Sequence, residues 1–342
     1  MIKKPWIVSM IIVIMTPVLI FGCFNKKPLD FERQRAREAR KTCPKYDIVA
    51  TFDPEGKRIS GTQEVLYKNN TGKELRELYF HIYPNAFKSY DEAPFPKDEI
   101  GRAYPEGFAP GCLSVERVFS GETELTYEIE DTLLKVILSE PLTPKGQIKI
   151  GVYFSALLPP SQGRYGYGEN TFNFGNWYPI LAVHDDTGWQ TDPYYAVGDP
   201  FYSDVGIYEV NIRAPKGYTI ASTGTRAEKR EEGEDTWWTF KADFARDFAW
   251  VASSKYKVIE GKAGDTQVTS FYIEGDEPYG EKALGFAQAA LEFFSSYFGK
   301  YPYPDFAVGA SDFYIGGMEY PNLVMIGRQF YTEGDFLEYV VV

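Results

Sequence analysis

The chain has 342 residues, of which 44% are hydrophobic, so it is long enough to bury a substantial core and to form about two domains. It carries 36 Lys and Arg against 48 Asp and Glu, and the resulting net charge of −12 argues against sequence-independent binding of nucleic acid. Aromatic residues make up 17% of the sequence, and together with 31 Gly and 22 Pro they favour a β-rich body with many turns.

The first segment has the layout of an export signal. Two lysines precede an apolar run over 5–21, which is followed by the small residue Gly22 and then by Cys23. The run is also nearly long enough to span a bilayer, so a retained transmembrane helix is the alternative. The stretch Leu19-Ile20-Phe21-Gly22-Cys23 resembles the box of bacterial lipoproteins, in which the cysteine becomes the lipidated first residue. This resemblance implies a signal peptide over 1–23 and a lipid anchor at Cys23. With either interpretation we expect the body on the extracytoplasmic face of the cell membrane.

The segment after the signal is polar. Four arginines alternate with Glu32 and Glu38 between residues 25 and 41, which predicts a spacer or a solvated helix. We assign 24–45 as a linker.

The remaining cysteines and the histidines limit the redox and metal chemistry. Cys43 and Cys112 can form a disulfide if the protein is exported, and the sequence leaves their pairing open. His81 and His184 are far apart and lack the spacing of zinc ligands, so we expect no catalytic zinc cluster from histidine. We expect His81, which lies in an apolar strand-like segment, to be structural.

From residue 46 onward, short segments alternate apolar and polar residues between turn signals, which is typical of β-strands. The expected strands include 65–67, 75–83, 133–138, 148–154 and 208–213. We therefore predict an all-β domain over 46–260.

The second half of this region is dense in aromatic residues mixed with Asn, Gly and Pro, as in Phe172-Asn173-Phe174-Gly175-Asn176-Trp177-Tyr178-Pro179. Such a stretch can line a sugar-binding cleft or form turns packed on a sheet edge. The sequence leaves both interpretations open.

The pattern changes after Gly275. Apolar residues then recur at steps of three and four, at Leu284, Ala287, Leu291, Phe294 and Phe298. This spacing predicts an amphipathic helix over 281–298 that ends at Gly299. A boundary is expected near 257–265, followed by a second domain over 261–342 in which a short strand covers 307–311.

The stretch Gly316-Gly317-Met318-Glu319-Tyr320-Pro321 is the most informative for function. Glycine lets another backbone approach closely. If the following segment 322–326 is a strand at the edge of a sheet, an extended peptide can lie along it, with Glu319 directed at the positive amino terminus of the peptide. The alternative is a tight turn at the two glycines, with Glu319 as a solvated charge.

Gly-Gly-Met-Glu resembles the exopeptidase motif of the aminopeptidase N-like family of zinc metallopeptidases, in which the glutamate holds the α-amino group of the substrate. The resemblance covers about residues 46–342, because the order of helix, Tyr-Pro-x-Pro, strand and glycine motif is the order in which the catalytic domain of the family begins. It implies that Gly316, Gly317, Met318 and Glu319 bind the substrate. The family commonly has asparagine at the next position, where this chain has Tyr320, so no role of that asparagine carries over.

The same resemblance implies the fold class. The aromatic region resembles the β-saddle domain of the family, so we expect a mainly β, sandwich-like amino-terminal domain over 46–260. The start of an α+β thermolysin-like catalytic domain is expected over 261–342. The partners implied are the amino terminus of a peptide and, through the lipid anchor, the membrane.

The end of the chain bears on activity. Asp335 can cap a helix, and Glu338 can close a capping box with it, although the terminal valines also suit a strand. In the family, the helix that begins here carries His-Glu-x-x-His, whose histidines bind zinc while its glutamate acts as general base. None of these residues is present. The resemblance therefore implies an amino-terminal fragment that lacks the zinc ligands and catalytic residues and is inactive by itself, whereas the complete family enzyme uses zinc.

Two functions follow from the sequence. The first is that of a fragment of a zinc aminopeptidase in which Glu319 anchors the α-amino group of the substrate. The second is a membrane-anchored extracytoplasmic β-domain that binds glycans or peptides without catalysis. A Ser-His-Asp hydrolase is disfavoured, because neither histidine has a recognisable setting.

Overall fold

The structure is a computed structural model that describes residues 35–198, 200–332 and 336–342. The chain forms two compact units, 1–41 and 42–342. In the first unit, residues 35–39 are helical, which fits the interpretation of the linker as a solvated helix. The signal-like segment, including Cys23, lies outside the described residues. Among the helices that are described, none is long and apolar enough to cross a membrane.

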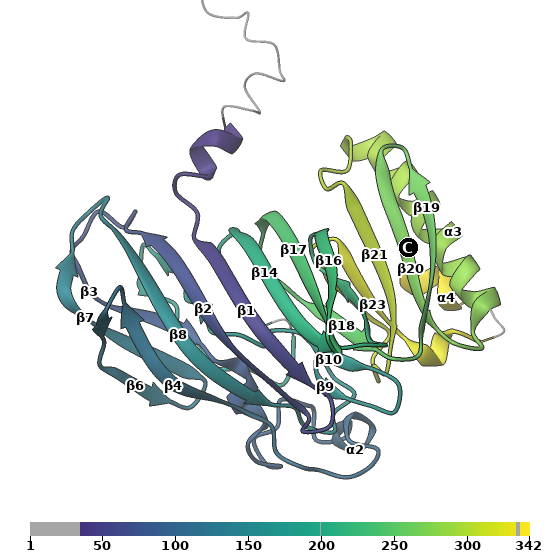
Figure 1. Ribbon diagram of the computed structural model, residues 1–342, viewed down its shortest axis with the longest axis horizontal. Helices are drawn as coiled ribbons and strands as arrows, with labels where there is room; N and C mark the ends of the chain where they lie inside the picture. Colours follow the sequence, from purple (N-terminus) through teal and green to yellow (C-terminus); the bar gives the residue numbers. More distant parts are fainter. Residues whose placement is uncertain (1–34, 199, 333–335) are drawn as a thin grey trace, which may run out of the picture. The chain divides into compact units, whose positions relative to one another are not determined.

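The largest sheet of the second unit has eight strands (Figure 1). Its central strand β1 (Lys45–Asp53) is buried at every second residue, and these buried residues are apolar, as expected for a sheet with one face on the core. β1 pairs in parallel with β14 and antiparallel with β2. The strands in spatial order are β16 (Thr225–Glu232), β17 (Asp235–Ala245), β14 (Gly206–Pro215), β1, β2 (Arg58–Lys68), β8 (Gln147–Leu157), β4 (Cys112–Ser120) and β5 (Thr123–Glu124).

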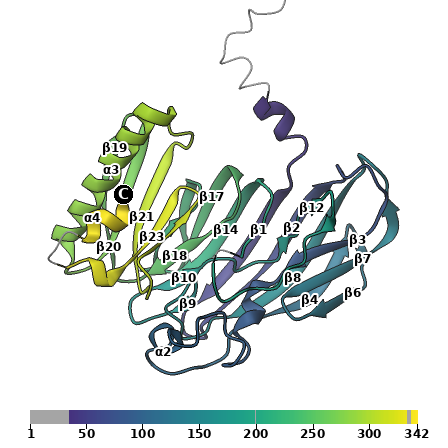
Figure 2. The ribbon, with the colours of Figure 1, turned by 180° about the vertical axis from the view of Figure 1, so that it is seen from behind.

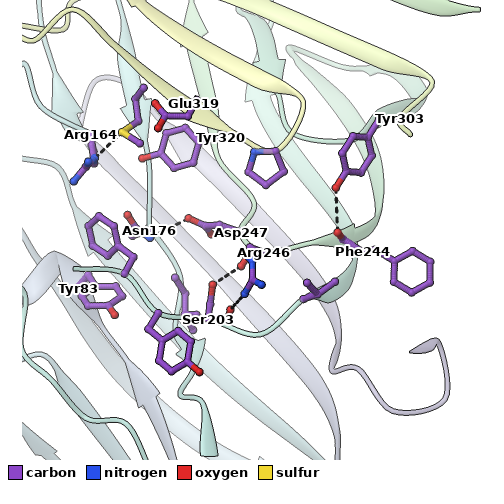
Figure 3. A pocket seen from close by; sticks show the side chains of 16 residues that line it. Tyr83, Arg164, Asn176, Ser203, Phe244, Arg246, Asp247, Tyr303, Glu319 and Tyr320 are labelled. Carbon is purple, nitrogen blue, oxygen red and sulfur yellow. Dashed lines mark hydrogen bonds between the residues drawn. The ribbon is translucent and has the colours of Figure 1, made fainter. Parts of the chain in front are cut away.

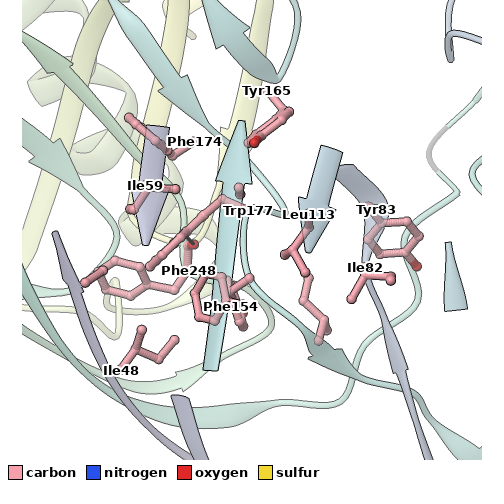
Figure 4. Close-up of a cluster of buried hydrophobic side chains, with 14 of the residues drawn as sticks. Ile48, Ile59, Ile82, Tyr83, Leu113, Phe154, Tyr165, Phe174, Trp177 and Phe248 are labelled. Carbon is pink, nitrogen blue, oxygen red and sulfur yellow. Dashed lines mark hydrogen bonds between the residues drawn. The ribbon is translucent and has the colours of Figure 1, made fainter. Parts of the chain in front are cut away.

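A four-stranded sheet packs against the inner face of the large sheet. Its strands are β15 (Thr219–Ser222), β18 (Trp250–Ser253), β10 (Phe172–Phe174) and β9 (Tyr165–Tyr167). The contact is aromatic: the Phe52 ring of β1 meets Phe174 and Trp250 edge-on, and the latter two rings are stacked 3.7 Å apart. Figure 4 shows part of this core, with Trp177 among the buried side chains.

The aromatic stretch over 172–179 is therefore core. Phe174, Trp177 and Tyr178 are fully buried, so these side chains do not form the open sugar-binding cleft that the sequence left as an alternative. The remaining small elements are a second four-stranded sheet, a two-stranded sheet and two short helices. They are β11 (Ile180–Leu181), β3 (Leu75–His81), β7 (Leu133–Leu142), β6 (Tyr127–Glu130), β12 (His184–Asp185), β13 (Gly188–Trp189), the 3₁₀ helix η1 (Tyr83–Phe87) and α2 (Ile100–Ala103).

The last part of the chain forms a five-stranded sheet with helix α3 (Glu277–Phe298) on one face (Figures 1 and 2). The strand order is β19 (Tyr256–Ala263), β20 (Thr266–Ile273), β21 (Asp305–Ser311), β23 (Leu323–Gly327) and β22 (Gly317–Tyr320). α3 connects the parallel strands β20 and β21. The 3₁₀ helix η2 (Arg328–Phe330) and helix α4 (Phe336–Val341) follow β23.

The opposite face of this sheet packs against the β15–β18 pair. Phe271, Leu323 and Met325 cluster there with Ala221 and Val251. The five-stranded sheet is thus held between α3 and the β-rich part. The domain boundary expected near 257–265 remains a prediction.

Helix α3 begins four residues earlier than the sequence indicated, because the turn after Gly275 continues directly into it and Pro278 occupies its first turn. Gly299 ends it with a φ of 101°. Leu284, Ala287 and Leu291 are buried as predicted. The last two members of the apolar stripe, Phe294 and Phe298, are 41% and 83% exposed.

The two cysteines and the terminal segment remain to be compared with the expectations from the sequence. Cys43 and Cys112 are not joined by a disulfide. The terminal segment forms helix α4, so the strand alternative for this segment is wrong. Asp335, the expected cap of this helix, lies outside the described residues.

Candidate functional site

Strand β22 carries most of the predicted glycine motif and lies at the edge of the five-stranded sheet in the described part of the chain. The sequence analysis considered 322–326 as a possible edge strand, but β23, which covers most of that segment, pairs on both sides and is an interior strand. A two-residue turn at Pro321 and Asn322 joins β22 to β23. Asn322 has a φ of 50°, which asparagine tolerates better than most residues. A positive φ at this position, directly after a proline, is typical of the third residue of a type II turn. The motif itself, and not the residues after it, presents the open backbone edge.

The side chains of β22 alternate between its two faces, as in any strand. Gly317 faces helix α4, since a Cβ at this position would lie 3.1 Å from Val340 Cγ1. Met318 and Tyr320 face the β-rich part and join the cluster under the sheet. Glu319 is exposed, lies on the same face as Gly317, and is the carboxylate of the strand.

Gly316 and Gly317 differ in their surroundings. A Cβ on Gly316 would make only ordinary contacts, the nearest at 3.7 Å, whereas one on Gly317 would also press on Met325 O at 3.2 Å. The absence of a side chain at Gly317 therefore lets α4 pack closely on the strand. Of the two glycines, Gly316 is the one with space beside it.

A cavity of about 530 Å³, which we call the edge-strand pocket, lies beside β22 (Figure 3). Glu319 lines it from the five-stranded sheet, and the opposite wall comes from the β-rich part. Members of that wall include Tyr83, Arg164, Asn176, Ser203, Arg246 and Asp247. The pocket thus brings the predicted carboxylate together with residues that lie far away in the sequence.

Asn176 and Asp247 are hydrogen-bonded to each other in this wall. Asn176 Nδ2 donates to Asp247 Oδ2 at 2.9 Å, and Asp247 Oδ1 accepts from Tyr178 Oη at 2.9 Å and from Phe248 N at 2.7 Å. Both residues are buried, with 4% and 8% exposure. Because Nδ2 is committed to Asp247, the amide oxygen of Asn176 is left as an acceptor, and it has no hydrogen-bond partner among the described residues.

Arg164 connects the two walls. Its Nε lies 3.0 Å from Met318 Sδ, and its guanidinium lies over the Phe201 ring, 5.1 Å from the ring centre. The pocket therefore has a fixed cation next to the strand that carries Glu319, and Figure 3 shows both residues at the same end.

Two phenols of the pocket stay neutral over the physiological range. Burial raises the pKa of Tyr83 and, to a smaller degree, that of Tyr303. Tyr303 Oη donates to Phe244 O at 3.1 Å. The neutral Tyr83 hydroxyl can serve as a hydrogen-bond donor, whereas the one hydrogen of the Tyr303 hydroxyl is already used in its bond to Phe244 O.

Glu319 also lines a second cavity of about 640 Å³. This helix-side cavity is mainly apolar and lies between α3, α4 and β23, with Phe294, Phe298 and Val340 among its members. Glu319 therefore lies between two cavities, the edge-strand pocket and the helix-side cavity. A ligand whose charged end meets Glu319 has space on either side.

Of the residues predicted from the sequence, Met318 and Glu319 line the edge-strand pocket, while Gly317 begins the same strand and Gly316 directly precedes it. The sequence analysis did not identify Arg164, Asn176 or Asp247. Asn176 lies in the aromatic stretch that the sequence analysis singled out, and its φ of 53° is one that asparagine tolerates better than most residues. Arg164 and Asp247 carry no local signal.

The histidines do not contribute to the site. His81 is buried in β3, stacked on Tyr83 at 4.7 Å, with Nε2 3.1 Å from Gln190 O. His184 lies in the two-stranded sheet against Trp189. Both serve packing roles.

Comparison with known proteins identifies the fold. An M1 zinc metallopeptidase from Deinococcus radiodurans matches with a TM-score of 0.54 and 12% identity, over 84% of this chain and 63% of that one. A point mutant of an M1 zinc metallopeptidase from the same organism matches with a TM-score of 0.55 and 12% identity, over 88% of this chain and 65% of that one. A two-domain M1 zinc metallopeptidase mutant bound to L-arginine matches with a TM-score of 0.55 and 12% identity, over 89% of this chain and 66% of that one. No protein-family model matches the sequence, and no curated protein matches it.

These similarities show that the chain has the fold of the M1 zinc metallopeptidases, the family that the glycine motif resembles. They confirm the predicted fold class, a mainly β first part followed by an α+β part. The chain spans less than two thirds of the length of each of these proteins.

Zinc is named in all three matching proteins. In residues 35–198, 200–332 and 336–342, no group of three His, Cys, Asp or Glu side chains is placed to hold a metal ion. The described residues therefore do not fit a catalytic zinc.

Proposed function

We propose that this chain, which has the fold of the M1 zinc metallopeptidases, supplies the substrate-binding part of an aminopeptidase that removes amino-terminal residues from peptides. Glu319 holds the free α-amino group, and the backbone of Gly316, Gly317 and Met318 supports the bound peptide. The observation that carries the proposal is that an exposed glutamate on an edge strand lines a 530 Å³ pocket.

Three physical features support it. An edge strand offers unpaired backbone groups, to which an extended peptide can add by main-chain hydrogen bonds. A carboxylate at the end of that edge makes a charge-assisted hydrogen bond with an ammonium group. The protein with bound L-arginine has the same fold, so a fold of this kind accommodates a free amino acid.

The pocket supplies a second acceptor for the same amine. Asn176 lines the pocket with Glu319, and its buried amide oxygen has no hydrogen-bond partner in the described part of the chain. We propose that the ammonium group of the substrate donates one hydrogen bond to the Glu319 carboxylate and a second one to the amide oxygen of Asn176. The hydrogen bond from Nδ2 to Asp247 keeps the oxygen of this amide turned away from Asp247.

For the chain as printed, we propose binding without hydrolysis. The sequence contains two histidines and no His-Glu-x-x-His, so the zinc ligands and the general base of the matching fold have no counterpart in it. The full chain supplemented with Zn²⁺ should therefore release no nitroaniline from alanine p-nitroanilide above the buffer rate. Release above that rate would contradict this part of the proposal.

The binding role is tested by calorimetric titration of the full chain with trialanine and with N-acetyl-trialanine. We expect the free peptide to bind at least about tenfold more tightly, because acetylation removes the charge that Glu319 recognises; tenfold corresponds to about 1.4 kcal/mol. Glu319→Gln should abolish this preference, and Asn176→Ala should reduce it.

The matched control is Glu209→Gln. Glu209 is exposed on β14, pairs with Lys241 at 2.9 Å and does not line the pocket. It should leave the preference unchanged. Equal affinities for the free and acetylated peptides in the unmodified chain would refute the role of Glu319.

We also propose that Cys23 is lipidated and tethers the protein to the extracytoplasmic face of the cell membrane. The support is the lysine, apolar run and Gly22-Cys23 order in the sequence. Expression in a bacterium with radiolabelled palmitate should label the full chain in the membrane fraction. Cys23→Ser should lose the label, whereas a chain that stays unlabelled in the membrane would favour a retained transmembrane helix.

A further inference from the structure

A third cavity, of about 300 Å³, lies on the face of the five-stranded sheet that is turned away from α3. On β20, Val268 packs toward α3, while the alternate residues Gln267, Thr269 and Phe271 line the cavity. The other wall comes from β15, β16 and β17. This inter-sheet cavity shares no lining residue with the edge-strand pocket.

The charges of the inter-sheet cavity are divided between its walls. Arg226 and Lys229 belong to β16 of the eight-stranded sheet, whereas Glu260 on β19 and Asp305 on β21 belong to the five-stranded sheet. Thr225 Oγ1 donates to Asp305 Oδ2 at 2.6 Å and joins the two walls. One wall is therefore cationic and the other anionic.

The two cations lie over an aromatic ring instead of pairing with acids. Lys229 Nζ is 4.6 Å and Arg226 Cζ 6.0 Å from the centre of the Trp238 ring. Within the described ranges, neither cation is within ion-pair distance of a carboxylate. The next cation of the strand, Arg230, does pair, with Glu232 at 3.1 Å. Both cations are thus available to an anionic group in the cavity.

Two buried donors complete the cationic side. Trp238 and Ser222 line the inter-sheet cavity, are 2% and 5% exposed, and each carry one polar side-chain atom, Nε1 and Oγ. Neither atom has a hydrogen-bond partner in the described residues. An unsatisfied buried donor costs about 1–3 kcal/mol, so such groups are normally retained where something supplies the missing acceptor.

We propose that the inter-sheet cavity binds a free amino acid with an apolar side chain. Its carboxylate is directed to the cationic wall with Arg226 and Lys229, and its ammonium group to the acidic wall with Glu260 and Asp305. The apolar side chain packs among the aromatic residues of the cavity, which include Phe271. A volume of about 300 Å³ is at the lower end for ligand pockets and suits a molecule of this size.

The test is an NMR titration of the uniformly ¹⁵N-labelled full chain, in which the indole N–H signal of Trp238 is assigned by its loss in Trp238→Phe. L-Phenylalanine should shift this signal saturably. 3-Phenylpropanoate, which lacks the ammonium group, and phenethylamine, which lacks the carboxylate, should each bind at least tenfold more weakly. No saturable shift, or equal binding of the three molecules, would overturn the proposal.

Two matched variants separate this cavity from general surface charge. Arg226→Gln should weaken L-phenylalanine binding at least tenfold. Arg230→Gln, on the same exposed strand but outside the cavity and paired with Glu232, should leave it unchanged. Equal effects of the two variants would contradict the proposal. The Trp238 shift should persist in Glu319→Gln, so this proposal and the aminopeptidase proposal can fail separately.

Ser222→Ala distinguishes a binding role from a structural one. Because the hydroxyl has no partner in the free protein, its removal should leave the melting temperature unchanged or raise it. The same variant should weaken L-phenylalanine binding at least threefold. A lower melting temperature with unchanged affinity would assign Ser222 a structural role and count against the proposal.

Discussion

The phenolic oxygen of Tyr320 occupies the space that a side chain on Gly175 would need, because an added Cβ would overlap that oxygen. Gly175 follows β10 in the β-rich part, and Tyr320 is the last residue of the edge strand β22. This contact fixes the strand that carries Glu319 against the opposite wall of the edge-strand pocket. It also explains how a tyrosine is accommodated directly after the glycine motif.

Replacing Gly175 with alanine should therefore displace Tyr320 and loosen β22. Overpacking of this kind costs about 1–3 kcal/mol in the free energy of unfolding, which chemical denaturation measures. Gly285→Ala is the control, because Gly285 is exposed in α3 and an added Cβ meets nothing within 4 Å. That control should gain about 0.5–1 kcal/mol from the better helix propensity of alanine. Equal stability of the two variants would show that Tyr320 can move at little cost.

The two glycines of the motif should respond differently to alanine. At Gly317 the new Cβ would be 3.1 Å from Val340 Cγ1 and 3.2 Å from Met325 O, so either α4 or the strand has to shift. We expect a loss of about 1–3 kcal/mol and faster proteolysis within α4. At Gly316 the nearest atom is 3.7 Å away, and alanine should be tolerated. Limited proteolysis followed by mass spectrometry compares the pair, and a more labile Gly316→Ala would reverse our assignment.

Asp247→Ala should remove the acceptor shared by Tyr178, Phe248 and Asn176. Because these donors are buried and bind a carboxylate, we expect a loss of about 2–3 kcal/mol, measured by denaturant unfolding. Asp235→Ala breaks the more exposed pair with Arg213 and should cost no more than about 1 kcal/mol. A cost at Asp247 as small as that at Asp235 would mean that the buried network contributes little to stability.

His81 should make stability depend on pH. Burial lowers the pKa of His81 from 6.5 to about 4. As the pH falls, His81 is therefore protonated in the unfolded chain before it is protonated in the folded one. The contribution of neutral His81 to the free energy of unfolding is fully present above pH 6.5 and is lost progressively between pH 6.5 and pH 4. The shift corresponds to roughly 3–4 kcal/mol, since one pKa unit is about 1.4 kcal/mol.

The measurement is the difference in unfolding free energy between the unmodified chain and His81→Gln from pH 7 to pH 4. The subtraction removes the contribution of carboxylates common to both proteins. The unmodified chain should lose stability relative to His81→Gln as the pH falls. A difference that stays constant over this range would show that His81 does not titrate on unfolding.

The strands of the β-rich part and helix α3 were largely predictable from the sequence. Buried apolar residues recur at every second position in β1 and at every third or fourth position in α3. The start of α3 was less accurate, since the first turn after Asp276 carries no apolar stripe. The candidate site was predictable only in part. Glu319 belongs to a short contiguous motif, whereas Arg164 meets Met318 across 154 positions of sequence.

The sequence by itself determined which residues alternate between core and solvent, and it marked one glutamate beside two glycines, because both are properties of neighbouring residues. Only the tertiary structure decided that β22 and not β23 lies at the sheet edge. It likewise decided that Asn176 and Asp247 line the same pocket as Glu319, and that Arg226 and Glu260 lie on opposite walls of one cavity. These relationships arise from the pairing and packing of strands that are distant in the chain, and no local pattern of residues specifies such pairings.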